Sequence, residues 1–249
     1  MSGHSKWATI KRKKAANDAK RSNQFAKLLR AVEVAAKEGG GDPAANMTLA
    51  SAIEKAKASS VPNDNIERAI KRGSGADASA ARYEEITYEG YAPGGIALFV
   101  EALTENRNRT AQDVRHAFTR NGGNLGETGS TAWMFARKGV IVVEKDAAPD
   151  EERLFELALE AGAEDLNDSE SSWEVVTEPT ALATVRDALR AGGIELFSAE
   201  LTMLPQSTIP VDGGEARKVL QLIEGLEDLE DVQNVYANFD IPEEVMAAL

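Results

Sequence analysis

The apolar residues of this chain change their spacing at one point, and that change limits the folds open to it. Over the first 73 residues they recur with the period of a helix. One apolar face groups Phe25, Leu28, Leu29, Val32 and Ala36. Glycines at 39–41 end this helix, a second helix is predicted to start near Asn46, and a third runs from Asn63, its expected cap, to Gly73. Three short helices of this kind predict a small bundle.

Residues 73–80 are Gly, Ser, Ala and Asp only, a composition typical of a linker. Beyond the linker the pattern becomes that of strands. The segments 83–91 and 96–104 flank Ala-Pro-Gly-Gly at 92–95, which predicts a hairpin. A helix is predicted over 110–120, with Thr110 and Asp113 spaced as a capping box, and a further strand over 131–137.

The segment 139–205 repeats strands and helices in the order βαββαβ, the ferredoxin-like split unit. Its elements are predicted as a strand at 140–144, a helix at 150–161, strands near Glu164 and Trp173, a helix at 180–191 and a strand at 194–203. The remaining residues predict a strand, a helix at 214–225, a strand at 232–239 and a terminal helical turn. We therefore expect an α+β protein with a helical bundle at 1–78, an α+β domain at 79–138 plus 206–249, and an inserted domain at 139–205.

Charge is distributed unevenly along the 249 residues. The net charge is −13, yet residues 1–30 hold nine Lys and Arg against one acid, Asp18. Residues 31–73 hold six of each sign, and the last 176 residues hold 13 bases and 34 acids. Because phosphate is attracted to one end and repelled by the rest, this distribution indicates a nucleic-acid partner at the N-terminal end.

Several classes of function lack support in the composition. There is no cysteine for disulfides, thiolate metal sites or a cysteine nucleophile. No apolar run is long enough for a membrane span, and no apolar segment follows the basic N-terminus as in a secretory signal, so a cytoplasmic protein is expected. The two histidines, His4 and His116, form no metal motif, and no nucleophile elbow is present. We therefore expect no enzyme activity, cofactor, metal or small-molecule substrate, while the oligomeric state stays open.

The basic N-terminal end supplies most of the candidate nucleic-acid contacts. The run at 11–14 points around a helix in every direction, so it suits an arm that becomes ordered on a phosphate backbone. Trp7 offers a ring on which an exposed base could stack. The predicted contacts are Lys6, Trp7, Lys11, Arg12, Lys13, Lys14, Lys20, Arg21, Lys27 and Arg30. The alternative is a solubilising tail with Trp7 buried against the bundle.

Two further segments could bind anions. Arg107 and Arg109 stand where a strand gives way to a helix, and free N–H groups at a helix start together with two arginines form a reasonable anion site. The alternative is that Asn108 or Thr110 caps the helix while the arginines pair with carboxylates. The glycine-rich segment 122–131 lacks the Gly-Lys-Ser/Thr ending of a phosphate loop and follows a helix, so a structural turn is expected there.

Several long strings of residues in this chain are distinctive. They are Gly-His-Ser-Lys-Trp at 3–7, Ile-Lys-Arg-Lys-Lys at 10–14, Gly-Gly-Gly-Asp-Pro at 39–43, Asp-Asn-Ile-Glu-Arg-Ala-Ile-Lys at 64–71, Tyr-Glu-Gly-Tyr at 88–91 and Thr-Glu-Asn-Arg-Asn-Arg-Thr at 104–110. Through these strings the chain resembles the YebC family of transcriptional regulatory proteins and translational activators. The resemblance implies an N-terminal helical bundle and two α+β domains, one inserted in the other. It also implies one of two functions, DNA-binding transcriptional regulation or ribosome-associated translation.

The residues themselves leave those two functions open. A sequence-reading DNA regulator needs an element that reaches base edges, usually presented by a dimer, and no segment pairs basic residues with a clear dimer seam. A factor that binds ribosomal RNA needs a basic arm and an acidic body turned away, which fits the charge distribution better. An enzyme has no candidate catalytic residues in this sequence.

Overall fold

The computed structural model describes residues 18–75, 83–147, 151–169 and 172–241. Contacts between residues divide it into two compact units. Of the described residues, the first unit takes in those up to Thr131 and then 213–235, and the second takes in 132–212 and 236–241. Most of the second unit is therefore inserted, in sequence, into the first.

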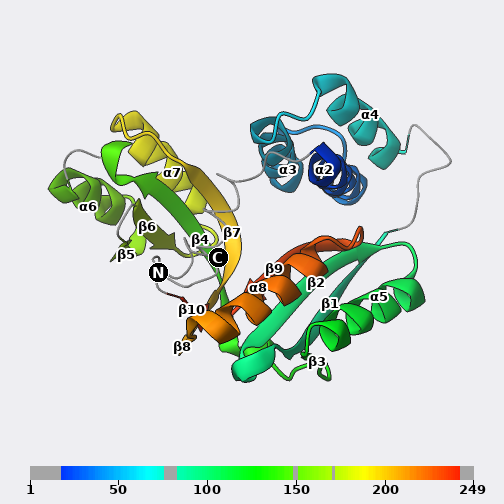
Figure 1. The fold of residues 1–249 in the computed structure, drawn as a ribbon. Helices are drawn as coiled ribbons and strands as arrows, with labels where there is room; N and C mark the ends of the chain where they lie inside the picture. Colours follow the sequence, from blue (N-terminus) through cyan, green and yellow to red (C-terminus); the bar gives the residue numbers. More distant parts are fainter. Residues whose placement is uncertain (1–17, 76–82, 148–150, 170–171, 242–249) are drawn as a thin grey trace. The chain divides into compact units, whose positions relative to one another are not determined.

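The first unit begins with the predicted bundle of three helices. These are α2 (Asp18–Gly39), α3 (Met47–Ala58) and α4 (Asn63–Gly73) (Figure 1). Their apolar faces meet in a core made of Val32, Ala35, Ala36, Leu49, Ala56, Val61, Ile66 and Ala69. The helical spacing of apolar residues thus predicts which face of each helix is buried.

Single residues fix how these helices join. The buried Asn46 caps α3 by accepting from the N–H of Leu49 at 3.1 Å, and its amide donates to the carbonyls of Ala35 (2.8 Å) and Gly40 (2.9 Å) at the end of α2. A Cβ on Gly73 would lie 2.0 Å from the carbonyl oxygen of Glu33, so only glycine lets α4 approach α2 this closely. The expectation that Asn63 caps α4 is wrong: Asn63 is the first helical residue, Pro62 precedes it, and Pro62 makes no side-chain cap hydrogen bond.

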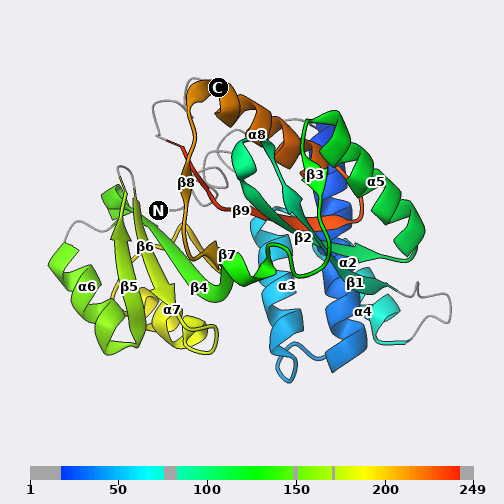
Figure 2. The ribbon, with the colours of Figure 1, turned by 90° about the horizontal axis from the view of Figure 1, so that it is seen from below.

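The rest of the first unit is a sheet covered by two helices. Its strands are β1 (Glu84–Tyr91), β2 (Ala97–Thr104), β3 (Asn124–Leu125) and β9 (Val232–Ala237), in the order β3-β1-β2-β9. β1 and β2 are antiparallel and joined by the expected tight turn, in which Gly94 has φ 79°. The helices α5 (Arg107–Arg120) and α8 (Gly213–Glu227) pack side by side on one face of the sheet (Figures 1 and 2).

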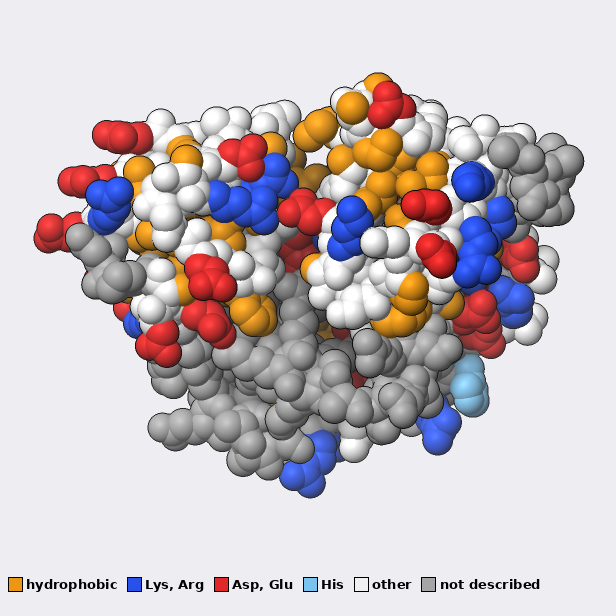
Figure 3. Space-filling model, turned by 90° about the horizontal axis from the view of Figure 1, so that it is seen from above, with side chains coloured by type: hydrophobic (Ala, Val, Ile, Leu, Met, Phe, Trp, Pro, Cys, Tyr) orange, Lys and Arg blue, Asp and Glu red, His pale blue; other side chains and the backbone are white. Residues whose placement is uncertain are grey.

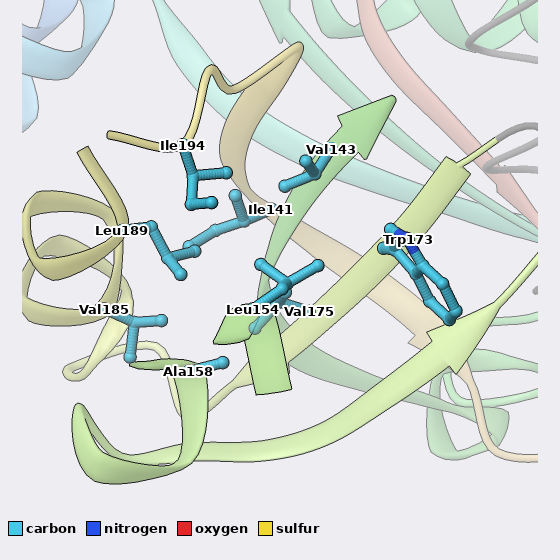
Figure 4. Packing of buried hydrophobic residues seen from close by; sticks show 9 residues of the cluster. All are labelled: Ile141, Val143, Leu154, Ala158, Trp173, Val175, Val185, Leu189 and Ile194. Atoms are coloured by element: carbon cyan, nitrogen blue, oxygen red, sulfur yellow. The ribbon is translucent and has the colours of Figure 1, made fainter. Parts of the chain in front are cut away.

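The second unit has the predicted βαββαβ order. Its elements are β4 (Phe135–Glu144), α6 (Glu151–Glu160), β5 (Ala163–Asp168), β6 (Ser172–Thr177), α7 (Leu182–Ala191) and β7 (Ser198–Pro205). The strands form an antiparallel sheet in the order β5-β6-β4-β7. Side chains from the sheet and both helices interlock beneath it, among them Ile141, Leu154 and Leu189 (Figure 4). A short parallel pair, β8 (Ile209–Pro210) with β10 (Phe239–Asp240), completes the unit.

One strand replaces the two that were predicted at 131–137 and 140–144. β4 runs unbroken from Phe135 to Glu144 between β6 and β7. The two predicted strands leave Lys138 and Gly139 between them, but a Cβ on Gly139 would lie 2.3 Å from Oγ1 of Thr177 on the neighbouring strand. The glycine therefore permits a close approach and does not interrupt the strand.

The domain boundaries proposed from the sequence stay a prediction. The proposed boundary between residues 138 and 139 falls within β4, while the contacts divide the chain between Thr131 and Ala132. The proposed boundary at 78 and the terminal helical turn lie outside the described residues.

Candidate nucleic-acid interface

The predicted contact residues fall into three groups in the structure. Six of them lie outside the described residues: Lys6, Trp7, Lys11, Arg12, Lys13 and Lys14. Lys20 and Arg21 belong to the start of α2, and the structure does not describe their side chains. The other four, Lys27, Arg30, Arg107 and Arg109, have described surroundings.

Lys27 and Arg30 face the sheet domain of the first unit. With Asn23 they form one row along α2, and the row lies against the end of α8 and the loop that follows it. Asn23 donates to the carbonyl of Asp228 at 2.9 Å, and the ammonium of Lys27 donates to the carbonyl of Glu227. Because the last carbonyls of a helix lack partners and carry partial negative charge, these side chains cap α8.

Arg30 is the most enclosed of the predicted contacts, with its side chain only 10% exposed. Its guanidinium donates to the carbonyls of Leu103 (3.2 Å) and Glu230 (3.1 Å). It also pairs with the carboxylates of Asp231 (3.0 Å) and Glu230 (2.9 Å), and lies 5.0 Å from the centre of the Tyr83 ring. The assignment of Lys27 and Arg30 to nucleic acid stays a prediction, but the structure gives both cations partners inside the protein.

Asp231 gathers the elements of the first unit around one buried carboxylate. Besides Arg30 of the bundle, it accepts from Arg109 (2.9 and 3.2 Å) and from the hydroxyl of Thr110 (2.7 Å), both in the first turn of α5. The hydroxyl of Thr104, at the end of β2, donates to the same carboxylate at 3.1 Å. We name this set, Arg30, Thr104, Arg109, Thr110 and Asp231, the Asp231 cluster.

The protonation of Asp231 follows from these contacts. Burial by itself raises the pKa of this carboxyl, but hydrogen bonds from Arg109 and Thr110 and the charge of Arg109 outweigh burial, so the pKa lies below its ordinary value of 3.8. The same contact raises the pKa of the Arg109 guanidinium. Asp231 is therefore a stable anion that already holds two of the predicted phosphate-binding arginines.

The side chains of Arg107 and Arg109 point in different directions and do not form one anion site. The predicted capping box of Thr110 and Asp113 is wrong, because α5 starts at Arg107 and the side chain of Asn106 caps it by accepting from the N–H of Arg109 at 3.1 Å. Arg109 turns inward to Asp231. Arg107 points outward with 69% of its side chain exposed, and its nearest carboxylate oxygen, on Glu84, is 3.7 Å away.

The glycine-rich segment 122–131 encloses a carboxylate of the protein itself. The buried Glu89 accepts from the N–H of Gly129 (2.7 Å) and the N–H of Thr131 (2.6 Å). The N–H of Gly126 donates to the carbonyl of the same glutamate at 2.8 Å. These contacts explain the segment as the structural turn that was expected.

The described surface mixes charges of both signs. On the face drawn in Figure 3, red carboxylate side chains lie among the blue Lys and Arg side chains. Within the described residues, no group of three or more His, Asp or Glu side chains could hold a metal ion. None of the described helices is long and apolar enough to cross a membrane.

Sequence reasoning missed the Asp231 cluster altogether. The carboxylate lies 201 residues from Arg30 and 122 from Arg109 along the chain, so no local spacing connects them. The sequence indicates only that a helix start rich in arginine lies among acidic residues. It does not show that Asp231 is the carboxylate with which Arg109 pairs.

Comparison with known proteins covers nearly the whole chain. A family model described as the TACO1/YebC protein N-terminal domain matches residues 5–76, and one described as the TACO1/YebC second and third domain matches residues 83–239. A protein of Rubrobacter xylanophilus named probable transcriptional regulatory protein is 59% identical over 99% of this chain and 98% of its own length. A protein of Beutenbergia cavernae with the same name is 57% identical over 100% of this chain and 99% of its own.

A solved structure is similar in fold as well. The conserved hypothetical protein Aq1575 from Aquifex aeolicus matches with a TM-score of 0.81 and 46% sequence identity, over 92% of this chain and 94% of that one. This likeness confirms the predicted α+β class, with three N-terminal helices followed by two four-stranded sheets with helices. The matches to both family models and the identity to full-length relatives show that the chain belongs to the TACO1/YebC family.

Proposed function

We propose that this protein is a cytoplasmic, DNA-binding transcriptional regulatory protein that holds nucleic acid at its basic N-terminal end. The observation that carries the proposal is the separation of charge, with nine bases and one acid in residues 1–30 against 13 bases and 34 acids after residue 73. The names of the relatives, probable transcriptional regulatory proteins, support it and include no enzyme among those compared.

The basic residues at the N-terminal end would bind nucleic acid through counterion release. Each phosphate neutralised by Lys or Arg frees condensed counterions, and this term supplies most of non-specific nucleic-acid affinity. Because Lys27 and Arg30 have partners within the protein, the proposed contacts rest chiefly on Lys6, Trp7, the run 11–14, Lys20 and Arg21. Trp7 adds a ring that can stack on an exposed base.

A second function, binding of ribosomal RNA by a translation factor, is favoured by the charge of the inserted segment. Residues 132–212 contain six bases and 17 acids. A long duplex that ran along such a protein would meet this repulsion, whereas folded RNA could accept the basic end alone.

Crosslinking in cells separates the two functions. Nucleic acid is crosslinked to the protein by ultraviolet light, recovered and sequenced. Discrete peaks at promoters are expected for the transcriptional regulator. A recovery dominated by ribosomal RNA would reject that function in favour of the translation factor.

The shared premise is tested by charge reversal at the arm. The variant Lys11→Glu with Lys13→Glu is compared with wild type by fluorescence anisotropy on labelled DNA over a salt series. Loss of two phosphate contacts lowers the slope of log K against log salt by about two. The matched control, Lys57→Glu with Lys71→Glu, changes the same charge at exposed positions on α3 and α4. Unchanged affinity and slope in the arm variant would contradict the proposal.

A further inference from the structure

The outward face of α5 carries an unusual set of side chains. Thr110, Val114, Ala117 and Phe118 form its buried face. On the opposite side, Asn108, Gln112, Arg115 and Thr119 are exposed and follow one another at steps of four, three and four residues, so they lie in one row along the helix. His116 and Arg120 are exposed beside this row. The face has no large apolar residue, and Asp113 is the one acid of α5.

The cations of this face have few partners in the protein. Among the described residues, Arg115 and Arg120 make no side-chain hydrogen bond and no ion pair, and Arg107 reaches Glu84 only at 3.7 Å. Arg30 and Arg109, by contrast, are held by Asp231 at 3.0 and 2.9 Å. Arg107, Arg115 and Arg120 are therefore accessible to a partner outside the chain.

The side-chain types on this row match those that read DNA. Arginine binds guanine, and asparagine and glutamine bind adenine, in each case through two hydrogen bonds in the major groove. From Asn108 to Thr119 the row extends about 16 Å, at 1.5 Å per residue. That length spans about five base pairs at about 3.4 Å each. The major groove of B-form DNA admits a helix, whereas the deep and narrow major groove of A-form RNA does not.

We propose that the exposed face of α5 is a second DNA contact, which enters the major groove of a B-form duplex. Asn108, Gln112 and Arg115 face base edges, and Arg107 and Arg120 bind phosphates on either side. This inference rests on the proposed function, because it assigns to the same duplex a contact beyond the basic arm. It also supplies the base-reading element that the sequence alone did not reveal.

The Asp231 cluster holds this face in position. Arg109 and Thr110 tie the first turn of α5 to Asp231, while Asn106 caps the same turn. The helix is thus fixed at the end that carries Arg107 and Asn108, which removes part of the ordering cost of binding. Arg109 and Thr110 act here as positioning residues and do not touch DNA.

The test compares variants that replace two arginines of α5, on two nucleic-acid probes. Wild type, Arg107→Ala with Arg120→Ala, and a control Arg107→Lys with Arg120→Lys are titrated with a labelled random-sequence DNA duplex and with a labelled RNA hairpin over a salt series. The alanine variant is expected to lower the salt slope on DNA by about two, and the lysine variant to keep it. Binding to the hairpin is expected to stay the same. Arg137→Ala with Arg153→Ala, at exposed positions of β4 and α6, controls for the loss of two positive charges.

A selection experiment tests whether side chains of α5 contact bases in the major groove. Wild type and Gln112→Ala each select duplexes from a random library, and the variant is expected to lose a preference for adenine at one position of the selected sequences. Equal preferences in the two proteins would overturn the groove assignment. So would a salt slope on DNA that the alanine variant leaves unchanged, or a loss on the RNA hairpin alone.

The outcomes separate this inference from the proposed function. If the α5 variants match wild type while the arm variant Lys11→Glu with Lys13→Glu loses DNA, only the α5 contact is rejected. If wild type itself fails to bind the duplex at low salt, both are rejected. A thermal melt of each variant that matches wild type assigns any loss of binding to the missing side chains.

Discussion

Nη1 of Arg30 lies 3.0 Å from Oδ1 of Asp231, and this ion pair joins the helical bundle to the sheet domain of the first unit. Both side chains are largely withdrawn from solvent, with exposed fractions of 10% and 6%. The pair also sits where the end of β2, the start of α5 and the loop after α8 meet, since Thr104, Arg109 and Thr110 share the same carboxylate. Changes at these residues should therefore affect the first unit as a whole.

Replacement of Arg30 by methionine keeps an unbranched apolar side chain and removes the guanidinium donors. We expect a loss of about 1–3 kcal/mol in the free energy of unfolding, because hydrogen bonds to charged groups are lost while Arg109 continues to neutralise Asp231. Equilibrium urea unfolding measures the loss. Lys37→Met, at an exposed position of the same helix, is the control. If Arg30→Met and Lys37→Met unfolded with the same free energy, the ion pair between Arg30 and Asp231 would not stabilise the protein.

Replacement of Asp231 by asparagine should cost more than that of Arg30. The isosteric amide removes the charge that Arg30 and Arg109 share, and breaking a buried ion pair typically costs about 3–5 kcal/mol. Because Arg109 is 45% exposed and can turn to water, we expect the lower end of this range. A double-mutant cycle of Arg30→Met and Asp231→Asn by urea unfolding measures the coupling, and additive effects would mean that the two side chains act independently.

Acid should weaken the first unit through the same carboxyl. The pKa of Asp231 in the folded protein lies below its ordinary value of 3.8, so the unfolded chain binds the proton first as pH falls. The stability contributed by the charge is complete above about pH 3.8 and is lost as pH falls from there through the lower folded-state pKa. The difference in unfolding free energy between wild type and Asp231→Asn should shrink over this window. A difference independent of pH would show that the charge of Asp231 is not the stabilising feature.

Gly73 should tolerate no side chain. An added Cβ would lie 2.0 Å from the carbonyl oxygen of Glu33, so α4 must move away from α2 in Gly73→Ala. We expect a loss of about 1–3 kcal/mol or more, typical of overpacking, although alanine is the better helix former. Thermal unfolding followed by circular dichroism tests this, with Lys71→Ala as a surface control on the same helix. A stabilised Gly73→Ala variant would contradict the close approach of the helices.

Glu89 should hold the glycine-rich loop by its charge. In Glu89→Gln the carboxylate contacts to the N–H groups of Gly129 and Thr131, now 2.7 and 2.6 Å, lose the negative charge and one acceptor. A loss of about 1.5 kcal/mol corresponds to an increase of about tenfold in amide hydrogen exchange at these two residues. Exchange that rises equally in α5, which the loop contact does not involve, would indicate a general loss of stability instead.

The elements with regular apolar spacing were predictable from the sequence. The stripe of α2 and the alternation of strands and helices after residue 139 gave the right faces and the right order, because local periodicity reflects burial directly. Two local predictions were wrong. The strands predicted at 131–137 and 140–144 leave Gly139 between them, although it lies inside β4 in close contact with Thr177. Thr110 was predicted to cap α5, although its hydroxyl binds Asp231.

The candidate contact residues were predictable only in part. Charge counts identify where phosphate would be attracted, but they do not distinguish Arg109, which Asp231 holds, from Arg107, which is 69% exposed. That distinction depends on which residues lie next to each other in space. The outward row of α5 was missed for a related reason, since the helix was expected to start at 110 and Asn108 was placed before it.

The position of β9 in its sheet has a consequence for synthesis of the chain. β9 adjoins β2 in the sheet, yet 127 residues separate Thr104 from Val232, and most of the second unit is made in between. At about 5–20 residues per second, translation of that stretch takes on the order of ten seconds. During this time the nascent chain carries β2 with an unpaired edge, and Asp231 has not yet emerged to meet Arg30. The second unit can complete its four-stranded sheet while the first unit waits. The unpaired N–H and C=O groups along this edge of β2 therefore stay open for seconds to pairing with other nascent chains.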